Sequence, residues 1–322
     1  MCDGALARRA LLFGAGGFAA QYLAEELSSH GYEVYGSDLK AGGHADHYVS
    51  FLECDLLDAE RVRQAVHAVQ PTHVVNLAAI SSVGLSWKIP QKTVEVNVCG
   101  TINLLEAVRT CETKPDLLLI GSSEEYAVSA EPLGEEAFLS ANNPYGISKT
   151  MQERFAQLYC EQYGLRVFQA RSFNHTGVGQ TDSFVVPSWC RQAARIAASG
   201  QPGVMRVGNT SVKRDFSHVR DVARAYRMIL EKGMPGRVYN VGSGRAVALE
   251  ELLRHIVSLS DQPISVQTDE RLFRAADNPV ICCDNRRIQD ELGWKPRLSV
   301  FDAVKEMFEE YKAQALQEAE HV

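Results

Sequence analysis

The first 170 residues alternate short apolar runs with amphipathic segments. Apolar runs of this length are typical of strands buried on both faces of a parallel sheet, and the segments between them suit helices that cover such a sheet. The alternation predicts an α/β fold built on a doubly wound parallel sheet with right-handed connections. The expected strands include 10–13, 33–36, 74–77, 117–120 and 166–170.

Composition narrows the class of protein. With 322 residues, of which 45% are hydrophobic, the chain can bury a large core. A formal net charge of −7 argues against nonspecific nucleic-acid binding, because neutralising phosphates needs a surplus of Lys and Arg. No apolar run approaches membrane-spanning length, so we expect no membrane partner.

Cysteine usage and the amino-terminal residues predict a cytoplasmic protein. The eight cysteines include no C-x-x-C pair, which favours reduced thiols. The apolar run at 10–13 ends at Gly14 and leads into an amphipathic segment, so it does not resemble a secretory signal. His44 and His47 lack the companions of a metal site, and we expect no metal.

A tyrosine and a lysine four residues apart are the first candidate chemistry. Tyr145 and Lys149 fall on one face of a predicted helix. An ammonium one turn from a phenol favours the phenolate and can lower the phenol pKa, which would make Tyr145 a usable proton donor. Such a pair occurs by chance on many helices. It gains weight here because a strand that ends in Gly121 and Ser122 precedes it.

A glycine-rich turn follows the first expected strand. Gly14 permits a sharp turn, Gly17 lets the backbone approach a pyrophosphate, and the following helix offers free N–H groups to the anion. Gly16 and Phe18 complete this predicted dinucleotide site. Ala20 stands where the usual pattern has a third glycine, which is a mild departure.

The glycine-rich turn, the strand that ends in Ser122, and the pair of Tyr145 and Lys149 follow one another in this order. With these three features the chain resembles the extended short-chain dehydrogenase/reductase family, which has a Rossmann fold. The segment 171–180 is similar to a motif of GDP-mannose 4,6-dehydratases and, more closely, of GDP-4-keto-6-deoxymannose reductases, with Val178 in place of the usual proline. Further segments that resemble the reductases are 82–87, 121–126, 207–209, 213–222, 239–244, 274–279 and 292–296.

The position of Asp38 bears on the coenzyme. A carboxylate at the end of the second strand is placed to accept both ribose hydroxyls and to repel a 2′-phosphate, which favours NAD(H). Lys40 could weaken this preference, so NADP(H) stays possible, and the reductases often carry a small hydroxyl residue here. Asp55 resembles the adenine-binding Asp of the family, although a helix N-cap is an equally good role. The resemblance implies further cofactor contacts from Leu56, Leu77, Ala78, Ala79, Asn97, Tyr145, Lys149 and Ser172.

The resemblance also implies the catalytic residues. Ser122 aligns with the hydroxyl residue that holds the substrate oxygen, with Ser123 as the competing choice. Lys149 would bind the nicotinamide ribose and ease deprotonation of Tyr145. Glu124 lies two residues after Ser122, where a dehydratase has the Glu that acts on C5 and C6 of the sugar.

The substrate is expected to be a nucleoside-diphosphate sugar held beyond the strand ends. Arg214 and Arg274 are two cations that could take the diphosphate between them. The segment around Val186 would bury a face of the base, and Arg191 would reach the base. Further expected substrate contacts are Ser81, Ser86, Ser123, Glu124 and Asn174.

The expected domain division follows from the same argument. Residues 1–173 and 214–244 are predicted to form the dinucleotide-binding domain, and 174–213 and 245–322 a smaller α/β sugar-nucleotide-binding lobe. The segment 238–241 should return to the main sheet, and 306–320 should form a solvated terminal helix. The resemblance implies a homodimer through the helices that carry Asn97 and Tyr145.

Four functions remain open on the sequence. A reductase passes hydride to C4 of a 4-keto-6-deoxy sugar, which would convert GDP-4-keto-6-deoxy-D-mannose to GDP-D-rhamnose. A 4,6-dehydratase returns the hydride to C6, and a 4-epimerase returns it to the opposite face of C4. A non-catalytic NAD-binding regulatory protein is the fourth. The intact Ser122, Tyr145 and Lys149 argue against that last alternative, and the motifs favour the reductase.

Overall fold

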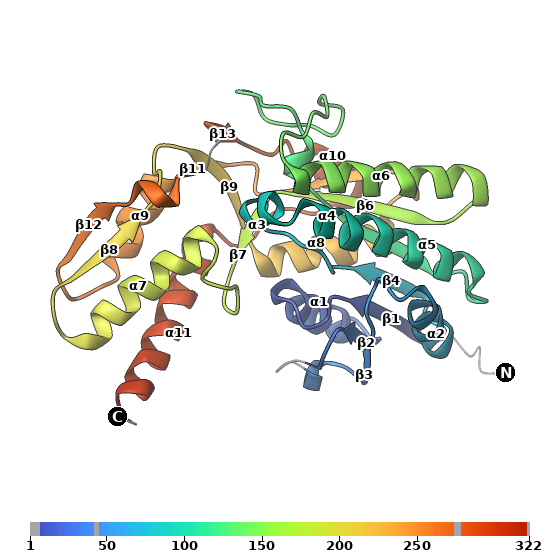
Figure 1. Cartoon of the computed structure of the whole chain (residues 1–322), viewed down its shortest axis with the longest axis horizontal. Coiled ribbons are helices and arrows are strands. Elements are labelled where there is room, and N and C mark those ends of the chain that lie inside the picture. The colour runs from blue at the N-terminus through green and yellow to red at the C-terminus, as the bar shows by residue number, and fades with distance from the viewer. Residues whose placement is uncertain (1–6, 42–44, 274–277, 321–322) are drawn as a thin grey trace.

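The computed structural model describes residues 7–41, 45–273 and 278–320. Within these residues the main sheet has seven strands in the order β10-β6-β5-β4-β1-β2-β3, all parallel (Figure 1). The strand order reverses between β1 and β4, so the predicted doubly wound sheet is confirmed. The strands are β1 Arg8–Phe13, β2 Tyr32–Asp38, β3 Ser50–Glu53, β4 His73–Asn76, β5 Asp116–Ser122, β6 Val167–Ser172 and β10 Val238–Val241.

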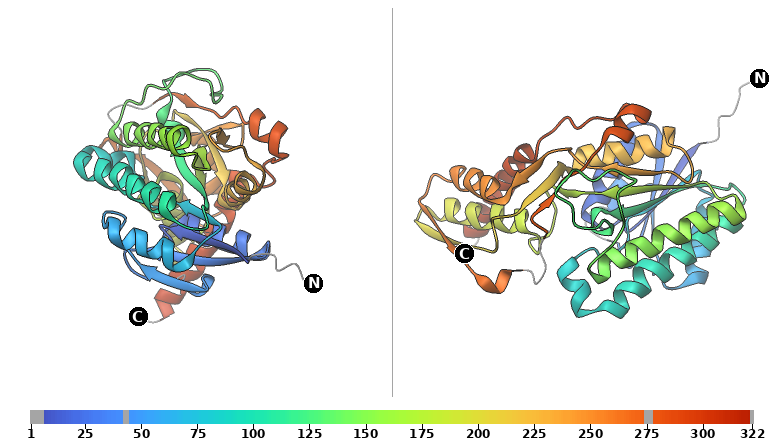
Figure 2. Two further views of the ribbon diagram at one scale, coloured as in Figure 1. Left: turned by 90° about the vertical axis from the view of Figure 1, so that its right-hand side faces the viewer. Right: turned by 90° about the horizontal axis from the view of Figure 1, so that it is seen from above.

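Helices cover both faces of this sheet. One core layer packs the sheet against α1, α8 and α10, and the other packs it against α2, α5 and α6. The view from above shows α5 and α6 running side by side on one face (Figure 2). These helices are α1 Phe18–Ser29, α2 Ala59–Val69, α5 Gly100–Thr110, α6 Pro144–Tyr163, α8 Val219–Lys232 and α10 Arg286–Leu292.

A smaller lobe lies beside the carboxyl ends of the strands (Figures 1 and 2). In it β9 pairs with β7, β11 and β13, while β8 pairs with β12. Its own core is formed largely by α7, α9 and α11. These elements are β7 Asn174–Thr176, α7 Val185–Ser199, β8 Gly203–Val207, β9 Lys213–His218, β11 Ala246–Ala248, α9 Leu249–Ser258, β12 Ile264–Thr268, β13 Val280–Ile281 and α11 Val300–Glu320.

Packing departs from the predicted domain division at two places. Ile288, Leu292 and Trp294 are buried in the core layer of α1 and α8, so α10 belongs with the main sheet although it lies inside 245–322. Conversely, Phe216 of β9 is buried in the core of the lobe. The return of 238–241 to the main sheet is confirmed, because β10 pairs with β6.

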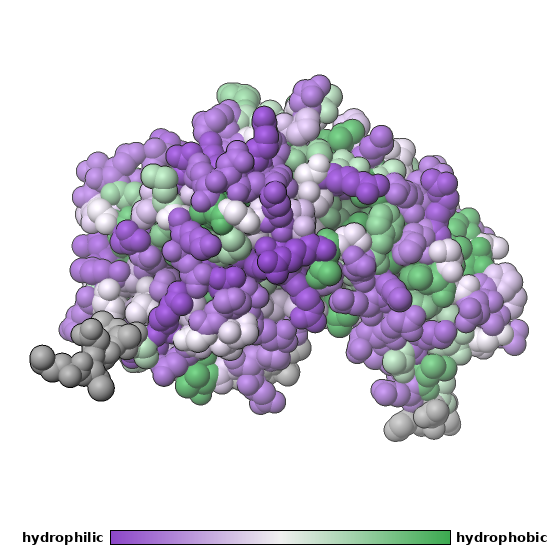
Figure 3. Space-filling view, turned by 180° about the vertical axis from the view of Figure 1, so that it is seen from behind, coloured by the Kyte–Doolittle hydropathy of each residue, from purple (hydrophilic) through white to green (hydrophobic). Residues whose placement is uncertain are grey.

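The expectation of a solvated terminal helix over 306–320 is wrong for its first part and confirmed beyond it. Helix α11 packs along α7 and buries Val304, Met307, Phe308 and Tyr311, whereas residues 312–319 are half-buried or exposed. The acidic residues between these positions masked the apolar stripe, which recurs at helical spacing. Seen from behind, the surface is mostly polar and its outline is indented between the main unit and the lobe (Figure 3).

Asn97 lies within a long helical run. The run begins at α4 Pro90–Val94, passes through one π-helical turn at Glu95–Cys99 and continues as α5. The short helix α3 Val83–Lys88 precedes it. Proline suits the first position of α4, because it needs no N–H partner there. The remaining short elements are η1 Ala45–His47, η3 Ser123–Glu125 and η4 Glu270–Leu272.

Candidate active site

The strand ends bring the expected cofactor and catalytic segments to one edge of the sheet. Phe13 of β1 is level with Ser37 of β2 and Asn76 of β4. Ser122 of β5 is level with Ser172 of β6. In a parallel sheet the carboxyl ends share one edge, and ligands bind where the strand order reverses. The glycine turn, the Ser122 strand end and the segment after Ser172 therefore open towards the same side.

The glycine turn has the shape that a dinucleotide needs. Gly14 has φ +79°, and a Cβ there would lie 2.5 Å from the Ala78 nitrogen, so only glycine fits. Gly17 is the N-cap of α1 and supplies no side-chain cap, which leaves first-turn N–H groups of the helix for an anion. These features fit the pyrophosphate of NAD(P), and Phe18 begins the helix directly behind it.

Asp38 is fixed beside this turn. Its Oδ2 accepts a hydrogen bond from the Gly16 N–H at 2.9 Å, and its Oδ1 accepts one from the Leu39 N–H at 2.7 Å. Each carboxylate oxygen has a second lone pair, so both can still accept from a ribose hydroxyl. The carboxylate thus lies at the end of β2, where the sequence argument placed it.

The alternative role of Asp55 as a helix cap is wrong. Helix α2 is capped by Asp58, whose side chain accepts from the Arg61 N–H. The Asp55 carboxylate instead accepts from the Leu57 N–H at 2.9 Å, and Leu56 is buried. The adenine contact of Asp55 stays a prediction.

Asn97 joins the loop after β4 to helix α6. Its Oδ1 accepts from the Ile80 N–H at 2.8 Å, and its Nδ2 donates to the Ser148 hydroxyl at 2.9 Å. The side chain is 1% exposed. In this structure Asn97 therefore positions the loop that contains Ala78 and Ala79, next to the glycine turn.

Two expected substrate residues that follow this loop differ in their exposure to solvent. Ser81 is exposed, whereas Ser86 is buried and its hydroxyl donates to the Val83 carbonyl at 2.7 Å. Ser86 lies on the inner side of α3, so the expectation that it lines the substrate side is not met. Ser86 points inward because it lies on the short helix α3, which the sequence did not predict.

Helix α6 starts where it brings Tyr145 to Ser122. Asn143 caps the helix by accepting from the Gly146 N–H at 2.9 Å, and Pro144 occupies the first position. A Cβ at Gly146 would overlap the Glu124 carbonyl, so glycine permits this close approach. The Tyr145 hydroxyl lies beside that of Ser122.

The pKa of Tyr145 is raised, whereas the sequence led us to expect a lowered one. Burial raises this pKa well above the usual value for a phenol, and the neighbouring Ser122 hydroxyl offsets only part of this. The Lys149 ammonium donates to the Ile120 carbonyl at 2.7 Å and to Gln152 Oε1 at 3.1 Å. Burial lowers the pKa of Lys149 to about 8. The expected lowering of the Tyr145 pKa is therefore wrong, because desolvation dominates and the nearby carboxyl groups of Glu124 and Glu125 raise the pKa further.

The two glutamates after Ser122 have different environments. Glu124 is partly buried, and its Oε2 accepts from Asn143 Nδ2 at 2.9 Å. Glu125 is fully buried, and its Oε1 accepts from the Ser122 N–H at 2.7 Å. Sequence reasoning missed Asn143 and Glu125. The order Asn-Pro before the helix is an N-cap signal that could have identified Asn143. The spacing of Ser122 and Glu125 is a capping-box signal that could have identified the contact of Glu125 with the Ser122 N–H, although it does not predict burial.

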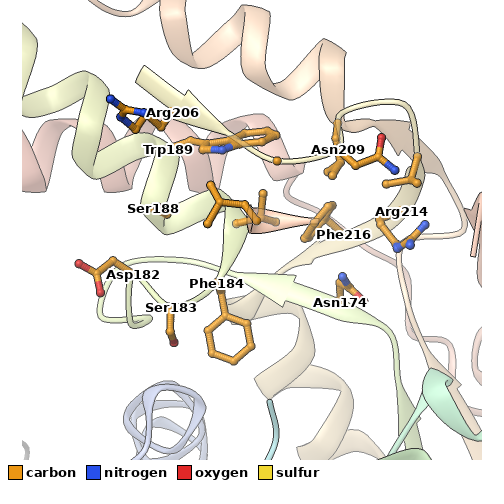
Figure 4. A pocket seen from close by; sticks show the side chains of 15 residues that line it. Asn174, Asp182, Ser183, Phe184, Ser188, Trp189, Arg206, Asn209, Arg214 and Phe216 are labelled. Atoms are coloured by element: carbon orange, nitrogen blue, oxygen red, sulfur yellow. The ribbon is translucent and has the colours of Figure 1, made fainter. Parts of the chain in front are cut away.

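The lobe contains a cavity of about 380 Å³, here called the lobe cavity. This volume is within the range of small-molecule sites. Figure 4 shows Arg206 and Asp182 at one end and Arg214, Asn174 and Asn209 at the other. Its lining residues are Asn174, Asp182, Ser183, Phe184, Val185, Ser188, Trp189, Arg206, Gly208, Asn209, Val212, Arg214, Phe216, Leu249 and Leu272.

The lobe cavity contains some of the expected substrate residues and not others. Asn174 and Arg214 line it. Val186 does not, because it is 1% exposed and packs in the core of the lobe. Arg191 does not line it either: its guanidinium lies 3.4 Å from Asp182 and over the Tyr311 ring. The helical period explains this, because Val186 and Arg191 project from other faces of α7 than Ser188 and Trp189 do.

Two of the expected residues cannot be placed in the structure. Arg274 and His44 lie outside the described residues. Ser172 donates to or accepts from the Tyr226 hydroxyl at 2.6 Å, and Ser123 is buried. No helix among the described residues has the length and apolarity to cross a membrane.

Comparison with known proteins identifies the family. The sequence profile of the family described as GDP-mannose 4,6 dehydratase matches residues 11–307. The chain belongs to this family. A GDP-6-deoxy-D-mannose reductase of Pseudomonas aeruginosa is 33% identical over 251 residues, which cover 77% of this chain and 83% of the reductase.

Two further relatives agree with this assignment. A GDP-mannose 4,6-dehydratase of Yersinia enterocolitica is 28% identical over 358 residues, with 97% of this chain and 96% of the dehydratase covered. The solved structure of RMD from Pseudomonas aeruginosa in complex with NADPH superposes with a TM-score of 0.83 at 29% identity, covering 96% of this chain and 99% of that one. The protein is an NAD(P)-dependent sugar-nucleotide oxidoreductase of the extended short-chain dehydrogenase/reductase family.

Proposed function

We propose that this protein reduces the C4 keto group of a nucleotide-linked 4-keto-6-deoxy sugar, and specifically converts GDP-4-keto-6-deoxy-D-mannose to GDP-D-rhamnose. The observation that carries the proposal is the position of the Tyr145 hydroxyl beside that of Ser122 at the end of β5, with Lys149 one turn further along α6. The similarity to the Pseudomonas reductase supports the choice of a net reduction.

The residues of the site suit proton delivery to a keto oxygen. A bound reduced nicotinamide would supply the hydride to C4. Tyr145 carries its proton at neutral pH, and because its raised pKa makes it a weak acid, proton transfer depends on stabilisation of the phenolate that is left. Ser122 would hold the keto oxygen in line through its hydroxyl. The Lys149 ammonium, buried behind Tyr145, would stabilise the phenolate that forms when the proton leaves.

The lobe cavity suits the nucleotide part of the substrate. Phe184, Trp189 and Phe216 offer aromatic surface to a base, and Arg206 and Arg214 offer cations to a diphosphate. Arg214 is 6% exposed, so a charge-assisted hydrogen bond from it to a phosphate would be weakly screened by solvent.

A dehydratase is the second candidate, and Glu124 favours it. This carboxylate lies two residues after Ser122 and is oriented by Asn143, which is the arrangement that a base for C5 would need. The identity to the Yersinia dehydratase, 28%, is lower than that to the Pseudomonas reductase, and this supports the reductase.

The two candidates differ in the fate of the hydride. With GDP-4-keto-6-deoxymannose, a reductase oxidises NADH one for one, and with GDP-mannose alone it forms no keto sugar. A dehydratase converts GDP-mannose without a net change in nicotinamide absorbance. Glu124→Gln should be mild in a reductase and should abolish a dehydratase. A 4-keto-6-deoxy product formed from GDP-mannose without added reductant would overturn our proposal.

We further propose that the protein is a cytoplasmic homodimer. Ile147, Met151 and Leu158 are 47%, 39% and 46% exposed and fall on one face of α6. An apolar stripe of this kind suits burial against the same helix of a second copy. Sedimentation velocity should give a dimer, and Ile147→Glu should give a monomer. A monomeric parent protein would contradict the proposal.

A further inference from the structure

Glu125 is a buried acid for which the proposed mechanism has no use. Its side chain is 0% exposed, and its Oε1 accepts from the Ser122 N–H at 2.7 Å. The carboxyl group lies over Gly121: a Cβ at Gly121 would come within 2.6 Å of Glu125 Oε1. Glycine at this position thus makes room for the carboxyl group at the point where β5 ends. The backbone from which the Ser122 hydroxyl projects is therefore held by Glu125.

The same carboxyl group faces the buried lysine. Lys149 Nζ donates to the carbonyl of Ile120, the residue directly before Gly121. Two of its three N–H donors are used by Ile120 and Gln152. Glu125 Oε2 is buried and has no hydrogen-bond partner among the described residues. An ammonium and a carboxyl group thus share one desolvated region, where their charges interact strongly.

We propose that Glu125 is a positioning residue of the active site, which holds the backbone of Ser122 through Oε1 and supports the ammonium of Lys149 through its negative charge. Its effect on reduction rests on the proposed function, whereas its effect on Lys149 does not. Neither role requires Glu125 to touch the substrate.

Other charges around Glu125 are partly compensated. The Glu153 carboxylate makes two hydrogen bonds with Arg171, at 2.6 and 2.9 Å, so its repulsion of Glu125 is reduced. Burial raises the pKa of Glu125 to about 8 and lowers that of Lys149 to about 8, whereas each charge favours the other, so Glu125 carries its negative charge chiefly as a pair with the Lys149 ammonium. The titratable or charged groups that face Glu125, Lys149 or Tyr145 are Glu124, Glu153, Arg171 and Tyr226.

The first test measures Lys149 directly. In protein labelled with ε-¹³C lysine, the Lys149 signal is assigned by its loss in Lys149→Arg, and its midpoint is followed with pH. Glu125→Gln keeps the shape and an acceptor for the Ser122 N–H but removes the charge. We expect it to lower the Lys149 midpoint by about one pH unit. Glu124→Gln is the matched control and should leave the midpoint in place, since Glu124 bonds to Asn143 instead. An unchanged midpoint in Glu125→Gln overturns the proposal, whatever the substrate is.

The second test uses turnover. If Lys149 must be charged, the alkaline limb of the kcat profile should move to lower pH in Glu125→Gln, with KM for the sugar nucleotide unchanged. Glu125→Leu also removes the acceptor of the Ser122 N–H and should lower kcat at every pH. A Glu125→Gln enzyme with a uniform loss of kcat and an unmoved limb would show a merely structural role and contradict the proposal.

Discussion

Replacing Tyr145 with Phe removes one hydroxyl from the centre of the candidate site. The hydroxyl lies beside that of Ser122, whose oxygen accepts from the Glu124 N–H at 3.1 Å and should keep this bond in the variant. Ser122 is therefore not left without a partner, and the cost to folding stability should be about 1 kcal/mol. Loss of a general acid lowers kcat by roughly 10²-fold to 10⁴-fold, which is about 3 to 5 kcal/mol of transition-state free energy.

The assay combines stopped-flow reduction of the 4-keto sugar nucleotide with calorimetry of NADH binding. Tyr145→Phe should lose kcat while its Kd for NADH stays that of the parent, because only the transferable proton is gone. Tyr163→Phe is the matched control, since it removes a phenol from the exposed side of the same helix. Turnover close to that of the parent in Tyr145→Phe would refute the active-site assignment, including the roles of Ser122 and Lys149.

Three further changes test other parts of the molecule. Asp38 should give a preference for NADH over NADPH in steady-state constants, and Asp38→Ser should reduce it; a clear NADPH preference of the parent would contradict this. Arg214→Ala should raise KM about tenfold to a hundredfold through loss of a charged hydrogen bond to the diphosphate. Arg214→Lys should lose less, and unchanged GDP binding in the Ala variant would place the diphosphate elsewhere. Burial lowers the pKa of His218, so the unfolded chain takes up its proton more readily than the folded one. The contribution of His218 to stability is therefore complete above about pH 6.5 and is lost as the pH falls. His218→Asn, which keeps a helix cap, should flatten the decrease of Tm between about pH 7 and 5; an unchanged slope would show that other groups cause it.

Local patterns in the sequence determined the sheet and its chemistry-bearing edge. The apolar runs around β1, β4 and β5 can only be buried strands, and the parallel arrangement follows from the helices between them. The glycine turn and the spacing of Tyr145 and Lys149 are likewise local, because a turn and a helix face need only neighbouring residues. The sequence therefore predicts the glycine turn and the helix of Tyr145 and Lys149 without any knowledge of distant contacts.

Tertiary packing decided which way helical side chains point and how deeply each group is buried. Helical phase turned Val186 and Arg191 away from the lobe cavity and Ser86 into the protein. Apolar contacts with the first core layer drew α10 to the main sheet. The pKa of Tyr145 and the burial of Glu125 depend on groups distant in sequence, since desolvation is set by everything packed around a side chain. A sequence fixes which groups are present, and only the folded chain decides how far water is excluded from them.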